Sequence, residues 1–417
     1  MRRFFYCFPI ICIFFLVSCA SNSTVIRDIS SDSQDSINLI EEEGVELQEE
    51  VSTEEVAQQI EKSQVKKLTL TFAGDIMAHT PNFKMKDYSL IYKDIEEIIL
   101  NDDFTFANLE TPVHMDRPYE NYPTFNVQPP YVQAAIDAGF QVFSLANNHT
   151  NDQGLQGIDA TLDYFKSKIS DGVYSAGIKE VGQSTLSYQV IEKDDWRILF
   201  VAITEIMNTH RYLDRIDYIS PNKARREVLC QELKTLRQEN PCDIFVLSVH
   251  TCEDEYVHEI TELRRNLYRS FIDSGVDIVW ANHPHLAKEW EIFQKDSEEG
   301  TFPYAIAMYA LGNTISGQRT NPQFSKPETN RDYTGDGYLI QVDFEKIMDP
   351  DDFSFKITDI RPYLITTYID PDKNYVIKQL DDEFIQSLRD EGIEKWPDYL
   401  NSRKILMEKI SGKVVIE

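Results

Sequence analysis

The chain has few basic residues and few cysteines for its length of 417 residues. It carries 41 Lys and Arg against 70 Asp and Glu, which gives a formal net charge of −29. A partner with a phosphate backbone needs clustered Lys and Arg, so the composition argues against nucleic acid as a partner and favours high solubility. An anionic substrate would have to meet a local positive centre, and a bound metal ion would provide one.

The N-terminal segment has the pattern of an export signal. Two arginines precede an apolar and aromatic run from Phe4 to Val17 that only Pro9 interrupts. The run, about 14 residues, is short for a membrane-spanning helix of about 20, and residues 1–18 fit a secretory signal. The ending Leu-Val-Ser-Cys19 resembles the lipobox of bacterial lipoproteins, which implies that Cys19 is lipidated and anchors the protein to a bacterial membrane. The alternatives are an uncleaved helical anchor or a cleaved signal with an incidental cysteine.

Residues 19–66 are expected to form an acidic, disordered tether. Between Ala20 and Lys62 there are 12 acidic and 2 basic residues, with no aromatic residue and no proline. A segment of this composition cannot bury enough apolar surface to offset the entropy of ordering. The folded part of the chain is therefore expected to begin near residue 67.

Cysteine is too scarce to organise the fold. Beyond Cys19 only three cysteines remain: Cys230, Cys242 and Cys252. An odd number without close spacing does not make a disulfide framework. We therefore expect at most one bridge.

After residue 65, apolar strands alternate with helical stretches, which predicts an α/β fold of mixed sheets flanked by helices. Five apolar runs are each followed closely by an Asp, Glu, Asn or His residue. The pairs are 68–73 with Asp75, 104–107 with Glu110, 140–146 with Asn148 and His149, 244–249 with His250, and 276–281 with His283 and His285. Ligands bind beyond the carboxyl ends of strands in open α/β sheets, so we expect these side chains to meet. Carboxylate, amide and imidazole groups suit Mn, Zn or Fe.

Several helices are expected from periodicity and stop signals. Apolar residues recur at helical spacing over 87–100. The stretch 129–138 reads as a helix that Gly139 ends. Near the C-terminus, we expect a strand that includes Phe355, followed by helices over 381–390 and 401–410.

Six short motifs occur in an order that matches a known family. They are Gly74-Asp75-Ile-Met, Asn108-Leu-Glu110, Ala146-Asn-Asn-His149 with Asp152, Val249-His250, His283-Pro-His285 and Leu311-Gly-Asn313. This set resembles the CapA-type capsule synthesis proteins, which belong by fold to the calcineurin-like metallophosphoesterases. The resemblance implies one large domain of the four-layer αββα type over 67–345, completed by a strand and helices over 346–417.

The resemblance also implies roles for individual residues. Six of them would ligate one or two divalent ions, Mn, Fe or Zn: Asp75, Glu110 as the bridge, Asn148, His250, His283 and His285. His149 would donate a proton to the leaving oxygen, and Asp152 would accept its other ring hydrogen and fix the tautomer. Asn313 and Glu253 are candidates for substrate contact. The alternative for Asn313 is a tight turn, and the alternatives for Glu253 are a solvated loop or a cation site.

The first motif departs from the pattern of the superfamily. That pattern has a histidine two residues after the aspartate, and this chain has Met77 there. One of two metal positions therefore lacks a nitrogen ligand. His79 lies close, but a residue four positions beyond Asp75 need not point inward. A two-metal site, a one-metal site and a metal-free binding site all stay open.

The leading hypothesis is a lipid-anchored protein of the cell envelope that acts in the synthesis, export or anchoring of capsule, by resemblance poly-γ-glutamate. Its site would be phosphoesterase-like, with metal-assisted attack at a phosphoryl or acyl centre while His149 protonates the leaving group. Its expected partners are the membrane, through the anchor, an anionic extracellular polymer and subunits of a membrane synthase. The alternatives are a non-catalytic polymer-binding scaffold of such a synthase, or a metal-dependent hydrolase or transpeptidase of γ-glutamyl bonds.

Overall fold

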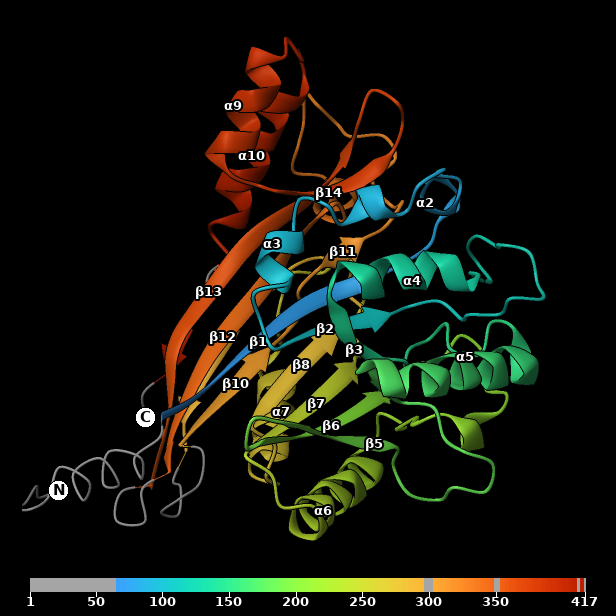
Figure 1. Ribbon diagram of the computed structural model, residues 1–417, viewed down its shortest axis with the longest axis vertical. Coiled ribbons are helices and arrows are strands. Elements are labelled where there is room, and N and C mark those ends of the chain that lie inside the picture. The colour runs from blue at the N-terminus through green and yellow to red at the C-terminus, as the bar shows by residue number, and fades with distance from the viewer. Residues whose placement is uncertain (1–64, 296–302, 349–352, 411–412, 416–417) are drawn as a thin grey trace, which may run out of the picture. The chain divides into compact units, whose positions relative to one another are not determined.

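The computed structural model describes residues 65–295, 303–348, 353–410 and 413–415 (Figure 1). All described residues belong to one compact unit. The expected export signal, Cys19 and the tether up to residue 64 lie outside the described residues. Within the described ranges, no helix is long and apolar enough to cross a membrane.

The first sheet is built around β1 (Val65–Ile76), with parallel strands on one side and an antiparallel extension on the other. The parallel side runs through β2 (Phe104–Leu109), β3 (Phe140–Ser144) and β4 (Tyr174–Ala176). The other side runs through β12 (Asp336–Met348), β13 (Phe353–Ile369) and β14 (Tyr375–Gln379). Short β11 (Asn313–Ile315) pairs with the end of β1. The C-terminal strands therefore complete the sheet that the N-terminal strands begin.

The second sheet has a parallel centre and antiparallel neighbours. Its parallel strands are β6 (Trp196–Thr204), β7 (Ile244–His250), β8 (Ile278–Asn282) and β10 (Tyr304–Met308). Around them lie β5 (Tyr188–Lys193), β9 (Trp290–Gln294) and β15 (Lys413–Val415). Because the central strands are buried on both faces, they are continuous apolar runs, as parallel strands usually are.

The two sheets pack face to face through large aromatic side chains. The rings of Phe72 and Trp280 lie 6.0 Å apart, and those of Phe106 and Phe200 5.6 Å apart. The indole N–H of Trp280 donates to the carbonyl of Ala73 at 2.9 Å, which ties β8 to the end of β1. This packing holds the carboxyl ends of β1 and β2 against those of β7 and β8.

Helices cover the outer faces. Figure 1 shows α4 (Pro129–Ala138) and α5 (Gly154–Lys168) beside the first sheet, and α6 (Lys223–Glu239) and α7 (Glu262–Ile272) beside the second. Buried leucines of α6 and Phe271 of α7 pack on the outer face of the second sheet. The expected α/β fold, with mixed sheets and helices in four layers, is confirmed.

The helix expected over 87–100 is wrong. The structure has a 3-10 turn, η1 (Ser89–Ile91), and a four-residue helix, α3 (Glu96–Ile99), separated by turns. Asp94, between them, accepts from the backbone N–H of Gln379 and from the ammonium of Lys378, each at 2.9 Å. These bonds hold the segment against β14, so tertiary contacts override its helical periodicity.

The other expected helices exist, and two of the three have shifted ends. α4 begins and ends as predicted, and Gly139 after it has a φ of 122°. α9 spans Asp382–Asp390, and the Asp381 carboxylate caps it by accepting from the Phe384 N–H at 2.8 Å. α10 spans Trp396–Met407 and so begins before the expected residue 401. The remaining short helices of the described ranges are α2 (Thr80–Phe83), α8 (Asn330–Tyr333) and the 3-10 helices η2 (Ile169–Asp171) and η3 (Leu213–Arg215).

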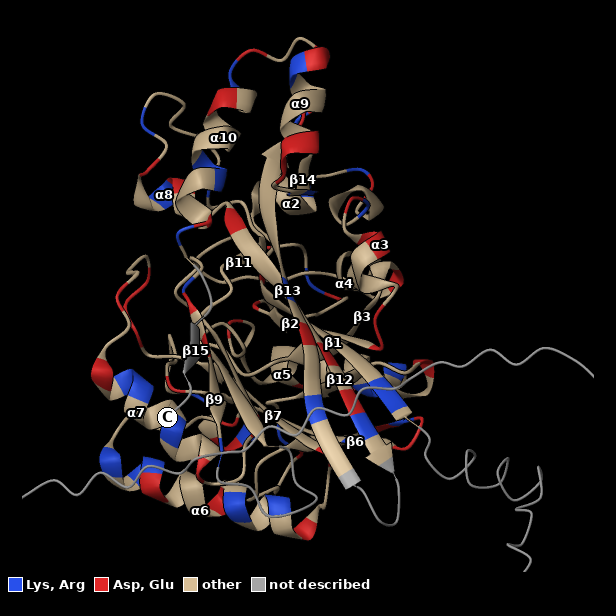
Figure 2. Cartoon of the chain, turned by 90° about the vertical axis from the view of Figure 1, so that its left-hand side faces the viewer, with Lys and Arg blue, Asp and Glu red and all other residues tan. Residues whose placement is uncertain are grey.

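Basic side chains on the outer helices are mixed with acidic ones. Figure 2 shows both signs of charge on α6, α7, α9 and α10. On α6 the ammonium of Lys223 lies 3.7 Å from Glu227, and on α10 that of Lys404 lies 3.1 Å from Asp382 of α9. Some of the charges on these helices therefore pair with an opposite charge nearby.

Cys230, Cys242 and Cys252 are all free thiols. The prediction of at most one bridge is therefore confirmed for these three. Burial raises the pKa of Cys242 to about 11, so this thiol is protonated at neutral pH and a weak nucleophile.

Two glycines bring the ends of β1 and β11 together. A Cβ on Gly74 would lie 1.9 Å from the carbonyl oxygen of Gly312, whose own φ is 77°. The N–H of Asp75 donates to that same oxygen at 3.0 Å. Only glycine allows this approach, and it places Asp75 beside Asn313.

Candidate metal centre

A buried carboxylate, Glu110, lies at the centre of a histidine cluster at the carboxyl ends of the strands. Its Oε1 atom is 3.7 Å from Nε2 of His285, 3.8 Å from Nε2 of His250 and 4.0 Å from Nε2 of His149. In the described part of the chain, no hydrogen bond reaches this oxygen. A buried acceptor without a donor costs free energy, and a cation among these atoms would remove that cost.

One candidate ion position lies on the side of β1. Asp75, Glu110 and His285 each offer a ligand atom, all within 4.8 Å of one another. Oδ2 of Asp75 is 3.1 Å from Nδ1 of His285, and its Oδ1 accepts from the Asn108 amide at 2.8 Å. The amide of Asn108 thus fixes the carboxylate so that its other oxygen faces the cluster.

A second candidate position lies on the side of β7 and shares Glu110. Glu110, His250 and His283 also offer ligand atoms within 4.8 Å of one another. The amide oxygen of Asn148 is 2.8 Å from Nε2 of His250, and Nδ1 of His283 is 3.1 Å from the same nitrogen. The structure therefore brings all six candidate ligands together, in two groups that share one carboxylate.

The electrostatics of the cluster fit a divalent cation. Burial, with the nearby Asp75, raises the pKa of Glu110 well above its ordinary value. Burial and the neighbouring histidines lower the pKa of His250 well below its ordinary value and that of His283 to about 3. These imidazoles are therefore neutral and keep the lone pair that ligation requires, and a cation would favour the ionised form of Glu110.

The last two histidines have unusual backbone conformations. His283 has a φ of 103° and His285 a φ of 58°, in a region that residues with a Cβ seldom adopt. Such strain costs on the order of 1–3 kcal/mol and concentrates at functional sites. Here it turns both imidazoles back toward Glu110 directly after β8.

His149 is oriented by a carboxylate. Its Nδ1 is 2.6 Å from Oδ2 of Asp152, and that oxygen also accepts from the Phe125 N–H at 2.8 Å. The ring of His149 packs edge-on against Phe125 at 4.7 Å. Its other nitrogen, Nε2, therefore faces Glu110 and is the atom available for proton transfer.

A cavity of about 700 Å³ opens over the cluster. Its lining includes Met77, His79, Tyr122, Tyr256 and Arg331 beside His149 and His285. Met77 is buried and supplies no nitrogen. The His79 side chain does line the cavity, and its Nδ1 accepts from the Gly317 N–H at 3.1 Å.

Glu253 is placed away from the cavity. Its carboxylate lies 3.4 Å from the ammonium of Lys288, and it is not part of the cavity lining. Glu255 takes that place and lies with His283 and His285 in a third group of ligand atoms within 4.8 Å. The two acidic residues alternate in direction along the loop, which sequence alone does not determine.

Asn313 supports a histidine and does not line the cavity. Its amide oxygen is 3.1 Å from Nδ1 of His285, and its amide nitrogen donates to the carbonyl of Thr334 at 2.8 Å. It begins β11 directly after Gly312. The structure therefore gives Asn313 a positioning role beneath His285.

Three residues of the site had no assigned role in the sequence. Asn108 lies within the quoted Asn-Leu-Glu motif and holds Asp75. The amide nitrogen of Asn208 lies 3.3 Å from Nδ1 of His149, and no sequence signal marks Asn208. Arg331, far along the chain, reaches the cavity through the short helix α8.

Two stacked mixed sheets thus bring carboxylate, amide and imidazole groups together at the ends of their strands. Residues 69–318 match the family described as bacterial capsule synthesis protein PGA_cap. The chain belongs to that family.

Two curated relatives are similar to this chain. The capsule biosynthesis protein CapA of Bacillus anthracis is 26% identical over 267 residues, which cover 60% of each chain. The PGA biosynthesis protein CapA of Bacillus subtilis (strain 168) is 25% identical over 257 residues, which cover 60% of this chain and 64% of the relative. The matched region thus spans less than two thirds of either relative.

Two solved structures were among those found to be similar to this chain. The calcineurin-like phosphoesterase YfkN from Bacillus subtilis has a TM-score of 0.40 at 12% identity, covering 81% of this chain and 100% of that one. A putative 5′-nucleotidase from Staphylococcus aureus has a TM-score of 0.40 at 14% identity, covering 74% and 57%.

Proposed function

We propose that this protein acts in the cell envelope in the synthesis, export or anchoring of an anionic capsule polymer, poly-γ-glutamate or a related one. Its metal centre would cleave a phosphoester or a related bond. The observation that carries the proposal is the unpartnered oxygen of Glu110, surrounded by three imidazoles, of which those of His149 and His285 line an open cavity. Lipidation at Cys19 would hold the protein at the membrane, beside synthase subunits.

The residues of the site have different roles in the proposed reaction. The six candidate ligands would hold one or two divalent cations, which would supply Lewis-acid stabilisation of charge at a phosphoryl oxygen. His149 presents Nε2 to the reacting group and protonates the leaving oxygen, while Asp152 holds Nδ1–H and orients the ring. Phe125 shields the ring of His149 from water on one side.

Replacing His149 by Asn is expected to lower kcat about 100-fold or more, because the general acid is lost. Bound metal should stay unchanged, because Nε2 of His149 is the most distant of the three nitrogens around Glu110. The measurement is hydrolysis of an aryl phosphodiester with added Mn, alongside elemental analysis of the purified protein.

His210, an exposed loop histidine, is the matched control. His210→Asn should retain the turnover of the unmodified protein. Equal turnover in His149→Asn and the unmodified protein would exclude His149 as the acid. Absence of turnover in the unmodified protein, with metal bound, would exclude a phosphodiesterase.

A non-catalytic scaffold is the second candidate, and Met77 favours it. The buried thioether stands where the superfamily places a nitrogen ligand, so one ion position is weakened. A third reading is a metal-dependent hydrolase or transpeptidase of γ-glutamyl bonds. Incubation with poly-γ-glutamate separates the readings: binding without any change in chain length indicates a scaffold, and shortened or transferred chains indicate cleavage of γ-glutamyl bonds.

Arg331 is expected to bind the anionic part of the substrate. Its guanidinium lies 4.9 Å from the ring centre of Tyr256 and donates to the Tyr256 hydroxyl at 3.3 Å. Within the described residues it has no carboxylate partner. Arg331→Met should raise KM about tenfold and leave kcat within about twofold, since an exposed charge contact is worth about 1 kcal/mol. Arg211→Met, in an exposed loop outside the cavity lining, is the control and should leave both constants unchanged.

A further inference from the structure

One histidine of the cavity over the metal centre belongs to none of the groups of candidate ligands. His79 lies four residues after Asp75, where the chain passes from β1 to α2, and its side chain lines the cavity of about 700 Å³. The three groups of ligand atoms in the described ranges do not include it. His79 therefore does not supply the nitrogen that Met77 lacks, and its imidazole is available for another role.

A backbone hydrogen bond determines which nitrogen of His79 carries the proton. Nδ1 accepts from the N–H of Gly317 at 3.1 Å. In a neutral imidazole one nitrogen accepts and the other carries the proton, so the proton of His79 lies on Nε2. Burial, together with His285 and His149, lowers the pKa of His79 to about 3, and the ring is therefore neutral at physiological pH.

The N–H at Nε2 has no acceptor within the described part of the chain. The hydrogen bonds that His79 makes there come from Nδ1 and from its backbone, whose N–H donates to Oδ1 of Asn82 at 3.0 Å. Besides His285, the groups whose charges act on the ring are His149 and Arg331, and all three line the same cavity. An anionic oxygen in this cavity would therefore meet the N–H of His79 as well as the guanidinium of Arg331.

Aromatic packing fixes the orientation of the His79 ring. It packs edge-on against Phe125, with the ring centres 5.1 Å apart, and Phe125 packs in the same way against His149 at 4.7 Å. One aromatic side chain thus holds both imidazoles. The N–H of His79 is therefore presented to the same cavity as the proposed proton donor.

The backbone that holds Nδ1 is itself fixed. A Cβ on Gly317 would lie 2.6 Å from the Cβ of His79, so only glycine allows this approach. Two residues further on, the buried guanidinium of Arg319 donates to the Asp336 carboxylate at 2.7 Å. The N–H of Gly317 therefore lies on a rigid segment, and the ring of His79 is positioned before any ligand binds.

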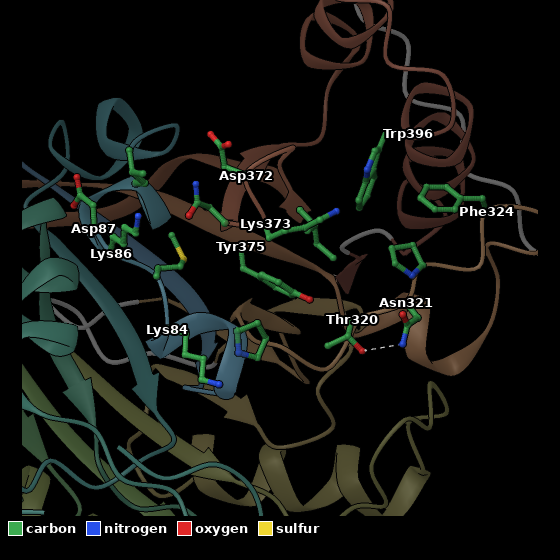
Figure 3. A pocket seen from close by; sticks show the side chains of 16 residues that line it. Lys84, Lys86, Asp87, Thr320, Asn321, Phe324, Asp372, Lys373, Tyr375 and Trp396 are labelled. Atoms are coloured by element: carbon green, nitrogen blue, oxygen red, sulfur yellow. Dashed lines mark hydrogen bonds between the residues drawn. The ribbon is translucent and has the colours of Figure 1, made fainter. Parts of the chain in front are cut away.

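The same segment forms part of the wall between two cavities. Figure 3 shows the second cavity, of about 1140 Å³, whose lining includes Thr320 and Asn321, and these two residues also line the cavity over the metal centre. Three lysines and two aspartates line the second cavity, so charges of both signs surround it. The groups that favour an anion, His79 and Arg331, lie in the cavity over the metal centre.

We propose that His79 donates a hydrogen bond from Nε2–H to an anionic oxygen of the reacting group of the substrate and so holds that group beside the metal centre. The proton stays on the imidazole, so no bond is made or broken at His79, and His149 remains the acid. Donors that are fixed before the substrate binds stabilise an oxyanion most effectively. The inference rests on the proposed function for the class of substrate, an oxyanion of the phosphate type.

Two substitutions separate the roles of the two ring nitrogens. His79→Gln places an amide nitrogen about where Nε2 lies and removes the acceptor of the Gly317 N–H. His79→Asn keeps an acceptor about where Nδ1 lies and has no atom in place of Nε2. If His79 only held Gly317 in place, Asn would substitute for it, whereas the proposed hydrogen bond to the substrate requires Gln.

The test measures binding of inorganic phosphate to the purified, Mn-loaded protein by titration calorimetry, and Mn affinity of the metal-free protein. We expect His79→Asn to bind phosphate at least about tenfold more weakly than the unmodified protein, because a hydrogen bond to a charged oxygen is lost. His79→Gln should stay within about threefold. Mn affinity should stay within about threefold in both variants, because His79 belongs to no ligand group. His210→Asn, at an exposed position outside the cavity lining, is the control and should change neither affinity.

Four results would overturn the proposal. Weaker Mn binding by both variants would make His79 a metal ligand. Loss of phosphate affinity in His79→Gln alone would assign it a structural role through Gly317, and equal losses in both variants would show that the ring matters and not its N–H. Unchanged phosphate binding in both, or none by the unmodified protein, would exclude the contact. Phosphate binding that depends on Nε2, without turnover of an aryl phosphodiester, would support His79 and reject the phosphodiesterase, so the two proposals fail separately.

Discussion

Glu110→Gln is expected to lower the affinity for Mn by at least about 100-fold. Changes in groups that only support metal ligands cost about 10–100-fold, and Glu110 belongs to both groups of candidate ligand atoms around β1 and β7. The amide keeps the size of the side chain and removes its charge. The measurement is titration of metal-free protein with Mn, followed by elemental analysis after gel filtration.

The metal-free form gives this experiment a second readout. The Oε1 atom of Glu110 is buried without a hydrogen-bond donor in the described structure. Glu110→Gln should therefore not lower the thermal unfolding temperature of metal-free protein, whereas added Mn should raise that of the unmodified protein alone. Glu253→Gln is the control and should retain Mn affinity within about threefold, because its carboxylate pairs with Lys288. Equal Mn binding by Glu110→Gln and the unmodified protein would contradict a metal centre here.

Asp336→Asn is expected to lower the free energy of unfolding by about 3–5 kcal/mol. Its carboxylate lies 2.7 Å from a guanidinium nitrogen of Arg319 and 2.6 Å from Nε of Arg403, and all three side chains are almost fully buried. The amide would leave two buried guanidinium groups without a charged partner. Urea unfolding at neutral pH measures the loss.

The dependence of this effect on pH follows from the same contacts. Burial raises the pKa of Asp336, but Arg403 and Arg319 outweigh burial and hold it below its ordinary value. A depressed carboxyl pKa stabilises the fold above the unfolded value of about 3.9 and ceases to do so as the pH falls through the folded value. The difference between Asp336→Asn and the unmodified protein should therefore shrink below about pH 4.

Asp343→Asn is the matched control. Asp343 pairs with Arg361 at 2.6 Å, but their side chains are 26% and 33% exposed. Solvent screens such a pair, so the expected loss is about 1 kcal/mol or less. Equal losses in the two variants would show that burial of the Asp336 cluster adds nothing to its strength.

Much of the fold could be predicted from local sequence patterns. Apolar runs such as 244–249 become strands wherever burial on both faces suits them, and Gly139 ends α4 as expected. The segment 87–100 could not be predicted in this way. Its helical periodicity competes with hydrogen bonds from β14 to Asp94, and these come from residues almost 300 positions further along the chain.

The candidate site, too, could be predicted only in part from the sequence. The candidate metal ligands come directly after strands, and the carboxyl ends of parallel strands lie at one edge of a sheet. That these residues lie close together could therefore be predicted from the sequence. The direction of each side chain was not. Glu253 points to Lys288 while Glu255 faces the histidines, and Asn313 lies under His285 instead of lining the cavity. Loop conformation sets these directions, and no periodicity encodes it.

The sequence by itself determined an acidic α/β protein with carboxylate, amide and imidazole groups at the ends of its strands, because strand patterns and ligand chemistry are local properties. Only the tertiary structure decided that Glu110 keeps an unpartnered oxygen among three imidazoles. The physical reason is that desolvation and charge compensation depend on neighbours brought from distant segments, which a linear pattern does not contain.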